Sequence, residues 1–241
     1  MKKSILSTLV TGLLSVSAAV SFAQTDGEWN ANSGDWGNST NWVGGNIANG
    51  TGSTADFIRN YTADPSTINI AGANYTVGKL HSGDTGGGQR LVFSSTDNST
   101  LTFDNGASPA EWTISSGIPS DTGQNAGLNL GVKIASEKLI INNQSANSTW
   151  AGFLSASTSG NKTIVNESTG TGDVIIGRNP LSGRSGAGAI SDGTGVLSFH
   201  QNSTTSRLFF SGNVSGADNL TFTGGLIWDK GDVAIYGKKG V

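Results

Sequence analysis

Cysteine is absent from this 241-residue chain, and proline occurs only 4 times and histidine only twice. Without cysteine there is no disulfide, no thiol nucleophile, no cysteine-ligated zinc site and no iron–sulfur cluster. The scarcity of proline excludes a collagen-like chain or a proline-rich linker. Most small exported domains rely on disulfides, so backbone ladders and stacked side chains must hold this fold.

Charge is also scarce, because Asp, Glu, Lys and Arg make up 13% of the residues, about half the usual share. Disordered chains normally carry more charge, so this composition favours an ordered fold whose surface is covered by Ser, Thr, Asn and Gly. The formal net charge is −3. A mildly acidic chain with scattered Lys and Arg is a poor candidate for binding nucleic acid.

The N-terminus has the pattern of a secretory signal peptide over residues 1–23. Lys2-Lys3 is the charged region, residues 5–20 form the apolar region, and Ser21-Phe22-Ala23 is a small-x-small cleavage site. We expect the mature chain to begin at Gln24, to have no membrane-spanning segment, and to reside in the periplasm, at the cell surface or outside the cell. An uncleaved anchor is disfavoured because the apolar run is short and interrupted by polar residues.

Short apolar runs separated by polar turns fill the rest of the chain, as in Leu91-Val92-Phe93 and Leu101-Thr102-Phe103. Gly contributes 36 residues, which favours many tight turns. No window shows the helical spacing i, i+3, i+4, i+7 over three turns. The runs are about three residues long and number about sixteen, which suits stacked coils better than a sandwich. The sequence predicts an all-β parallel β-helix, with a β-sandwich as the alternative.

Three tryptophans lie close together near the start of the predicted mature chain, at Trp29, Trp36 and Trp42. Stacked repeats need a cap over the exposed end of the first coil, and large aromatic rings supply one. Residues 24–56 are therefore predicted to form an N-terminal cap. The alternative interpretation is an aromatic platform that binds sugar rings through these three side chains.

Several stretches resemble exported proteins of the autotransporter-passenger type, which carry autotransporter-associated β-strand repeats. The opening Gly34-Asp35-Trp36 with Asn41-Trp42 is similar to the start of such proteins, and Leu101-Thr102-Phe103-Asp104 is similar to the stretches after that start. The segment from Ser211 to Gly225 resembles one of their repeat units. The resemblance covers most of residues 28–225.

That resemblance implies a right-handed β-helix at the cell surface or released from it, often adhesive. In the family a C-terminal outer-membrane barrel or a sorting tail normally comes next, whereas this chain ends at Lys239-Gly240-Val241 without either. Residues 57–241 are thus expected to be β-helix repeats that belong to a longer passenger or to a protein exported only past the inner membrane. The last coil would expose strand edges, so we also expect self-association at this end.

Catalytic motifs are weak in this sequence. Asp-Thr-Gly occurs at Asp84 and Asp121, but neither copy follows the apolar strand that an aspartic protease requires, so both are interpreted as turns. His81 and His200 have no neighbours at metal-ligand spacing. A polysaccharide lyase would need acids clustered on one face. The candidate acids are scattered among the turns: Asp56, Asp64, Asp84, Asp97, Asp104 and Asp173.

The sequence therefore predicts an exported structural or adhesive protein, with no catalysis and no cofactor or metal. Its expected partners are cell-surface glycans or other surface proteins. The alternatives are a carbohydrate-binding module that uses the tryptophan cluster and a lyase-like β-helix. Asn142, Asn143 and Asn147 are also predicted to join ladders of amide hydrogen bonds between stacked coils.

Overall fold

The computed structural model describes residues 24–97, 99–116, 127–150, 153–154, 160–177, 190–191, 196–211, 220–221, 226–230 and 233–236. The predicted signal peptide, the second Asp-Thr-Gly triplet at Asp121 and the C-terminal segment after Tyr236 lie outside these residues. In the part described, no helix is both long and apolar enough to span a membrane.

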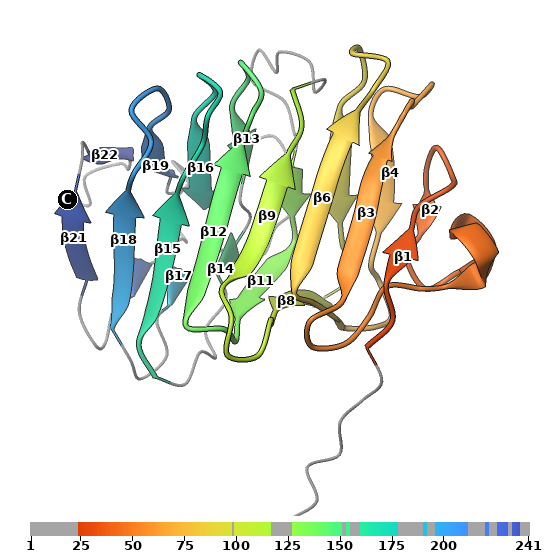
Figure 1. Ribbon diagram of the computed structural model, residues 1–241, viewed down its shortest axis with the longest axis horizontal. Helices are drawn as coiled ribbons and strands as arrows, with labels where there is room; N and C mark the ends of the chain where they lie inside the picture. Colours follow the sequence, from red (N-terminus) through yellow and green to blue (C-terminus); the bar gives the residue numbers. More distant parts are fainter. Residues whose placement is uncertain are drawn as a thin grey trace, which may run out of the picture.

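Short strands stacked in parallel build the molecule (Figure 1). The first sheet contains, in order of pairing, β1 (Gly27–Glu28), β3 (Thr54–Arg59), β6 (Lys79–Asp84), β9 (Ala110–Ile114), β12 (Lys138–Asn143), β15 (Lys162–Asn166), β18 (Leu197–Gln201) and β21 (Leu226–Lys230). Neighbours in this sheet are not neighbours in the chain, because each coil passes through other sheets before it returns.

The remaining strands fall into three further sheets. The second sheet contains β2 (Gly34–Asp35), β4 (Ser66–Asn69), β7 (Leu91–Ser94), β10 (Gly127–Asn129), β13 (Thr149–Trp150), β16 (Val174–Gly177), β19 (Leu208–Ser211) and β22 (Val233–Tyr236). The third contains β5 (Tyr75–Val77), β8 (Thr100–Phe103), β11 (Gly131–Ile134) and β14 (Phe153–Leu154), and the fourth contains β17 (Ile190–Ser191) and β20 (Leu220–Thr221).

This topology is a parallel β-helix, so the predicted fold class is confirmed and the sandwich alternative is wrong. Neighbouring strands pair in parallel, with continuous register where β12 pairs with β9 and β15 and with a register shift after Phe199 where β18 pairs with β21. A sandwich would require antiparallel neighbours. In Figure 1 the first sheet runs upward in front, the chain returns behind it, and successive coils advance from right to left, so the coil is right-handed.

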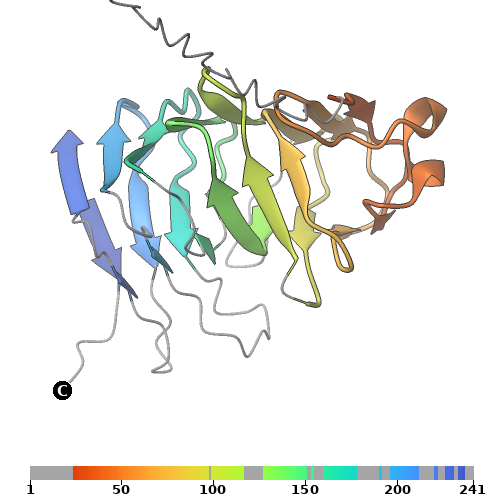
Figure 2. The ribbon, with the colours of Figure 1, turned by 90° about the horizontal axis from the view of Figure 1, so that it is seen from below.

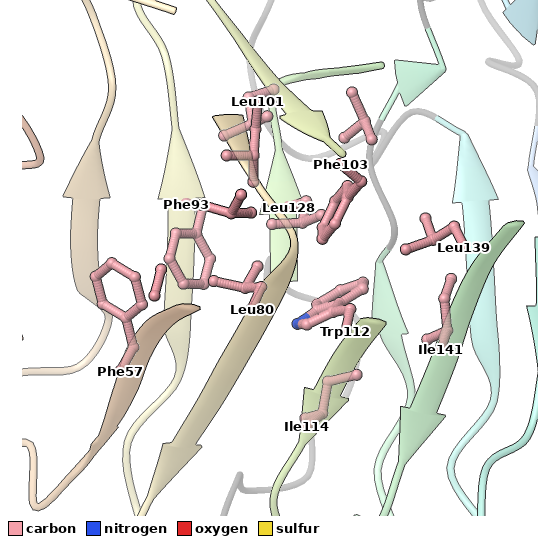
Figure 3. Close-up of a cluster of buried hydrophobic side chains, with 14 of the residues drawn as sticks. Phe57, Leu80, Phe93, Leu101, Phe103, Trp112, Ile114, Leu128, Leu139 and Ile141 are labelled. Atoms are coloured by element: carbon pink, nitrogen blue, oxygen red, sulfur yellow. The ribbon is translucent and has the colours of Figure 1, made fainter. Parts of the chain in front are cut away.

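The interior is a continuous stack of apolar side chains (Figure 3). Alternation along each strand sends every second residue inward, as in β9, where Ala110, Trp112 and Ile114 are buried. Parallel register then places inward residues of successive coils over one another, so that Trp112 lies between Leu80 and Ile141. The chain has no disulfides, so burial of this apolar column is a main source of its stability.

The N-terminal segment predicted to form the cap contains only short elements before β3. Residues 24–53 hold β1, β2 and two short 3-10 helices, η1 (Ser39–Asn41) and η2 (Val43–Gly45). The first long strand, β3, already begins at Thr54 rather than after residue 56. Because β1 and β2 pair with β3 and β4, the cap is also the first incomplete coil of the helix (Figure 2).

Candidate functional site

The three predicted site tryptophans lie together inside the cap. Trp29, Trp36 and Trp42 are only 2%, 0% and 3% exposed. The ring centroids of Trp29 and Trp42 lie 5.2 Å apart at 90°, and those of Trp36 and Trp42 lie 5.3 Å apart at 62°. Phe57 packs against all three rings from the next coil. These edge-to-face and tilted contacts are typical of aromatic packing in a core.

The polar atoms of two cap rings are also directed inward. Trp36 donates its indole N–H to the carbonyl of Ala48 at 3.0 Å, and Trp42 donates to the carbonyl of Trp36 at 2.6 Å. A sugar platform needs an exposed ring face, and none of the three rings offers one. The arrangement fits the cap interpretation, and sugar stacking on these rings would require the cap to open.

The outer face of the first sheet carries two pairs of ionisable side chains near its N-terminal end. Asp56 and His81 are register partners, with 4.0 Å between Oδ2 and Nδ1. The hydrogen bond from His81 is the largest influence on the Asp56 carboxyl and lowers its pKa. Lys79 and Glu111 are also register partners, with 3.8 Å between Nζ and Oε2. Both pairs are partly exposed, so they contribute little to stability and leave a polar, mixed-charge surface.

A shallow cavity of about 430 Å³ borders the same end of this sheet. It is lined by Asp26, Gly27, Glu28, Val43, Asn46, Thr54 and Asp56. Asp26 accepts the backbone N–H of Thr54 at 2.7 Å and Asp56 accepts that of Ile58 at 2.8 Å, so two of the three carboxylates in the lining are engaged in the fold. Within the described ranges, no group of three or more His, Cys, Asp or Glu side chains is arranged to hold a metal ion.

Five of the six aspartates considered as catalytic candidates lie at turns or strand ends, and Asp56 lies within strand β3; each bonds to the chain itself. Asp84 is the most enclosed, with no exposed surface, and it accepts backbone N–H groups from Tyr61, Gly86, Gly88 and Gln89 at 2.8–3.1 Å. Burial of this carboxyl is the largest single influence and raises its pKa, but the four hydrogen bonds together lower the pKa below its usual value. The turn interpretation of this Asp-Thr-Gly triplet is therefore confirmed.

The other five aspartates are engaged in the same way. The partners are Ile58 N–H for Asp56, Arg90 for Asp64, Ser95 and Gly72 for Asp97, Thr51 for Asp104 and Arg207 for Asp173. Carboxylates that are held by corners of different coils do not converge on one reacting atom. They act as local supports for turns.

A buried polar corner joins the first and second sheets in the C-terminal half. The inward column that is apolar at Leu80, Trp112 and Ile141 continues as Asn166 and Gln201. Asn166 donates to the side-chain oxygen of Gln201 at 3.0 Å. Both side chains are at least nine-tenths buried. This pair is an amide ladder of the kind predicted, but it occurs at residues that the sequence pattern did not indicate.

The predicted ladder residues have different roles. Asn143 is fully buried and donates its amide to the carbonyl of Gly172 in the next coil at 3.1 Å and to that of Asn147 at 2.7 Å. Asn142 is partly exposed and accepts the N–H of Thr169 at 3.3 Å. Hydrogen bonds to the next coil are thus present at both Asn143 and Asn142, although their partners are backbone and hydroxyl groups rather than other amides.

A second cavity, the corner cavity, opens over this polar corner. Its volume is about 460 Å³. It is lined by Thr171, Asp173, Gln201, Ser203, Thr204, Thr205, Ser206 and Arg207. The only signal for it in the sequence is the polar run Ser203-Thr204-Thr205-Ser206-Arg207 between two strands.

Comparison of the chain with protein-family models, with curated proteins and with solved structures finds no match. Functional conclusions therefore rest on the fold and on the sites described above.

Proposed function

We propose that this protein is an exported structural or adhesive module of the autotransporter-passenger type, which acts at the cell surface or outside the cell without catalysis. The observation that carries the proposal is the parallel β-helix, sealed at its N-terminal end by the buried tryptophan cap. Such a coil presents long, regular polar faces and keeps its apolar residues inside, which suits contact with surfaces or neighbouring proteins.

The distribution of polar groups supports the same function. The acids that a lyase would use are bound to turns in different coils, so a lyase-like β-helix is the less favoured alternative. Recognition of carbohydrate through Trp29, Trp36 and Trp42 is an alternative that requires the buried rings to become exposed. The expected partners are surface glycans or other surface proteins.

A pull-down experiment tests this proposal. The chain from Gln24 onward is mixed with insoluble polysaccharides and with cell-surface preparations, and bound protein is measured beside the Trp36→Ala variant. We expect saturable binding to at least one surface preparation, and we expect it to persist in any Trp36→Ala protein that is still folded. Absence of binding to every preparation would contradict an adhesive role, and a folded variant that loses binding would favour the tryptophan platform.

A further inference from the structure

The corner cavity has the geometry of a small-ligand site that the proposed function does not yet use. It lies where the corner formed by residues 202–207 meets the preceding coil at Thr171 and Asp173. Its volume of about 460 Å³ falls within the range of about 300–1,000 Å³ typical of small-molecule sites.

The side chains around the cavity are fixed before any ligand arrives. Gln201 is a buried lining residue whose position is fixed by two hydrogen bonds. Its amide N–H donates to the carbonyl of Ser203 at 2.9 Å, and its amide oxygen accepts from Asn166 at 3.0 Å. Thr205 is tied to the preceding coil through a 2.7 Å hydrogen bond from Oγ1 to the carbonyl of Gly170. Preorganised polar groups of this kind lower the entropy cost of binding.

An ion pair sets the electrostatics of the rim. Arg207 binds Asp173 through Nη2–Oδ2 at 2.8 Å and Nε–Oδ1 at 3.2 Å. The Asp173 side chain is only 14% exposed, whereas that of Arg207 is 66% exposed. The two charges therefore balance each other, and the guanidinium stays within reach of a ligand that enters from solvent.

The chemistry of the lining selects one ligand class. Every lining residue is polar. The hydroxyls of Ser203 and Thr205 already donate to the carbonyls of Ser168 and Gly170, whereas the exposed hydroxyl of Thr204 can both donate to and accept from a ligand. The lining contains no apolar side chain that would recognise a lipid or an aromatic ring, and its charged pair is balanced. We propose that the corner cavity binds one end or one short stretch of a neutral, hydroxyl-rich glycan. This inference rests on the proposed adhesive function and names its ligand class and site.

The chain contains a matched control corner. Arg90 and Asp64 form the same kind of pair at the same junction of the first and second sheets in an earlier coil, with Nε–Oδ1 at 2.8 Å. Thr62 is an exposed threonine at that junction, on the coil that carries Asp64, whereas Thr204 lies on the coil that carries Arg207. Arg90→Ala and Thr62→Trp therefore repeat each test substitution where the corner cavity is not altered.

Isothermal titration with soluble hexasaccharides provides the test, using neutral glucose and N-acetylglucosamine oligomers and a charged galacturonate oligomer. We expect a neutral oligomer to bind. Thr204→Trp should abolish binding, because the larger side chain fills the exposed rim of the cavity and leaves the hydrogen bonds of Gln201 and Thr205 in place. Arg207→Ala should weaken binding by about tenfold or more, as loss of a hydrogen bond to a charged group does. Arg90→Ala and Thr62→Trp should bind like the unaltered protein.

Three results would overturn the inference: no binding of either neutral oligomer, preference for the galacturonate oligomer, or unaltered binding by Thr204→Trp. Binding of the same variants to cell-surface preparations separates this outcome from failure of the proposed function. If Thr204→Trp still binds a surface preparation, the adhesive proposal stands and the cavity is not its site. If the unaltered protein binds neither hexasaccharides nor any preparation, both proposals fail.

Discussion

Asn143 illustrates how single polar side chains stabilise a chain that lacks cysteine. It is fully buried, and its amide joins its own turn to the next coil through the carbonyls of Asn147 and Gly172. Its side-chain oxygen accepts the N–H of Ser145 at 3.0 Å. A Cβ on Gly172 would lie 2.0 Å from the carbonyl oxygen of Asn147, so glycine is required for the two coils to approach this closely.

Substituting Asn143→Ala should therefore destabilise the protein. The change leaves at least two buried backbone groups without a partner, which costs about 2 kcal/mol of unfolding free energy. In a chain of this length that lowers the melting temperature by about 4–8 °C. The control is Asn142→Ala, which removes only a partly exposed contact and should leave the melting temperature nearly unchanged. Equal melting temperatures for Asn143→Ala and the unaltered protein would contradict the proposed role of this amide.

Ionisation of Asp84 makes the stability of the folded protein depend on pH. The pKa of Asp84 is lower in the folded protein than in the unfolded chain. The ionised Asp84 carboxylate therefore stabilises the folded protein fully at pH values above the pKa of about 3.9 in the unfolded chain. This stabilisation is lost as the pH falls through the lower pKa of the folded protein. We expect Asp84→Asn to destabilise the protein at pH 7 by about 3 kcal/mol, because an amide cannot accept all four N–H groups.

Urea unfolding at pH 7 and at a series of lower pH values measures this effect. The difference between Asp84→Asn and the unaltered protein should shrink as the pH falls below about 4. Asp64→Asn, which alters an exposed ion pair, should cost no more than about 1 kcal/mol at pH 7. A difference for Asp84→Asn that stayed constant between pH 7 and pH 3 would show that ionisation of this side chain is unimportant.

The cap is the structural unit that ends the apolar column, and Trp36 lies at its centre. Its ring is fully buried, stacks on Tyr75 at 5.2 Å and packs on Phe93 from a later coil. Trp36→Ala should lower the unfolding free energy by about 3–5 kcal/mol. Val43→Ala, in the same cap but 45% exposed, should have little effect. Similar unfolding midpoints in urea for the two variants would mean that the cap does not support the fold.

Local patterns in the sequence were sufficient to predict the strands and the kind of fold. Runs such as Leu91-Val92-Phe93 became strand β7 because short clusters of aliphatic, β-branched and aromatic residues suit a pleated coil. The exact strand bounds did not follow, since β3 begins at Thr54, where Asp26 from the cap holds the Thr54 N–H. Register between coils also depends on contacts that a single run does not contain.

The sites were less predictable than the strands. The tryptophans were found because large rings are rare and conspicuous, but their burial depends on Ala48 and Phe57, which the pattern near Trp36 does not identify. The amide pair of Asn166 and Gln201 forms only because parallel pairing brings two residues far apart in the chain together. The corner cavity likewise arises where neighbouring coils meet, and no single stretch of sequence contains all of its lining.

The two ends of the β-helix differ within the part of the chain that the structure describes. The N-terminal end is covered by the cap, whereas β21 and β22 are the last strands of their sheets and each pairs on one side only. Unpaired strand edges bind other strands, so self-association at this end is predicted. Sedimentation over a hundredfold range of concentration should show a rising average mass. A single monomeric species throughout that range would contradict the prediction.

Location at the cell surface or outside the cell is the central claim for the whole molecule, and it is tested most directly on intact cells that produce the full chain. Antibodies against the folded chain from Gln24 are applied to unbroken cells and to the culture medium, and the recovered protein is examined by N-terminal mass spectrometry. We expect labelling of intact cells or release into the medium, with Gln24 as the first residue. Protein found only inside the cells and still beginning at Met1 would contradict this claim.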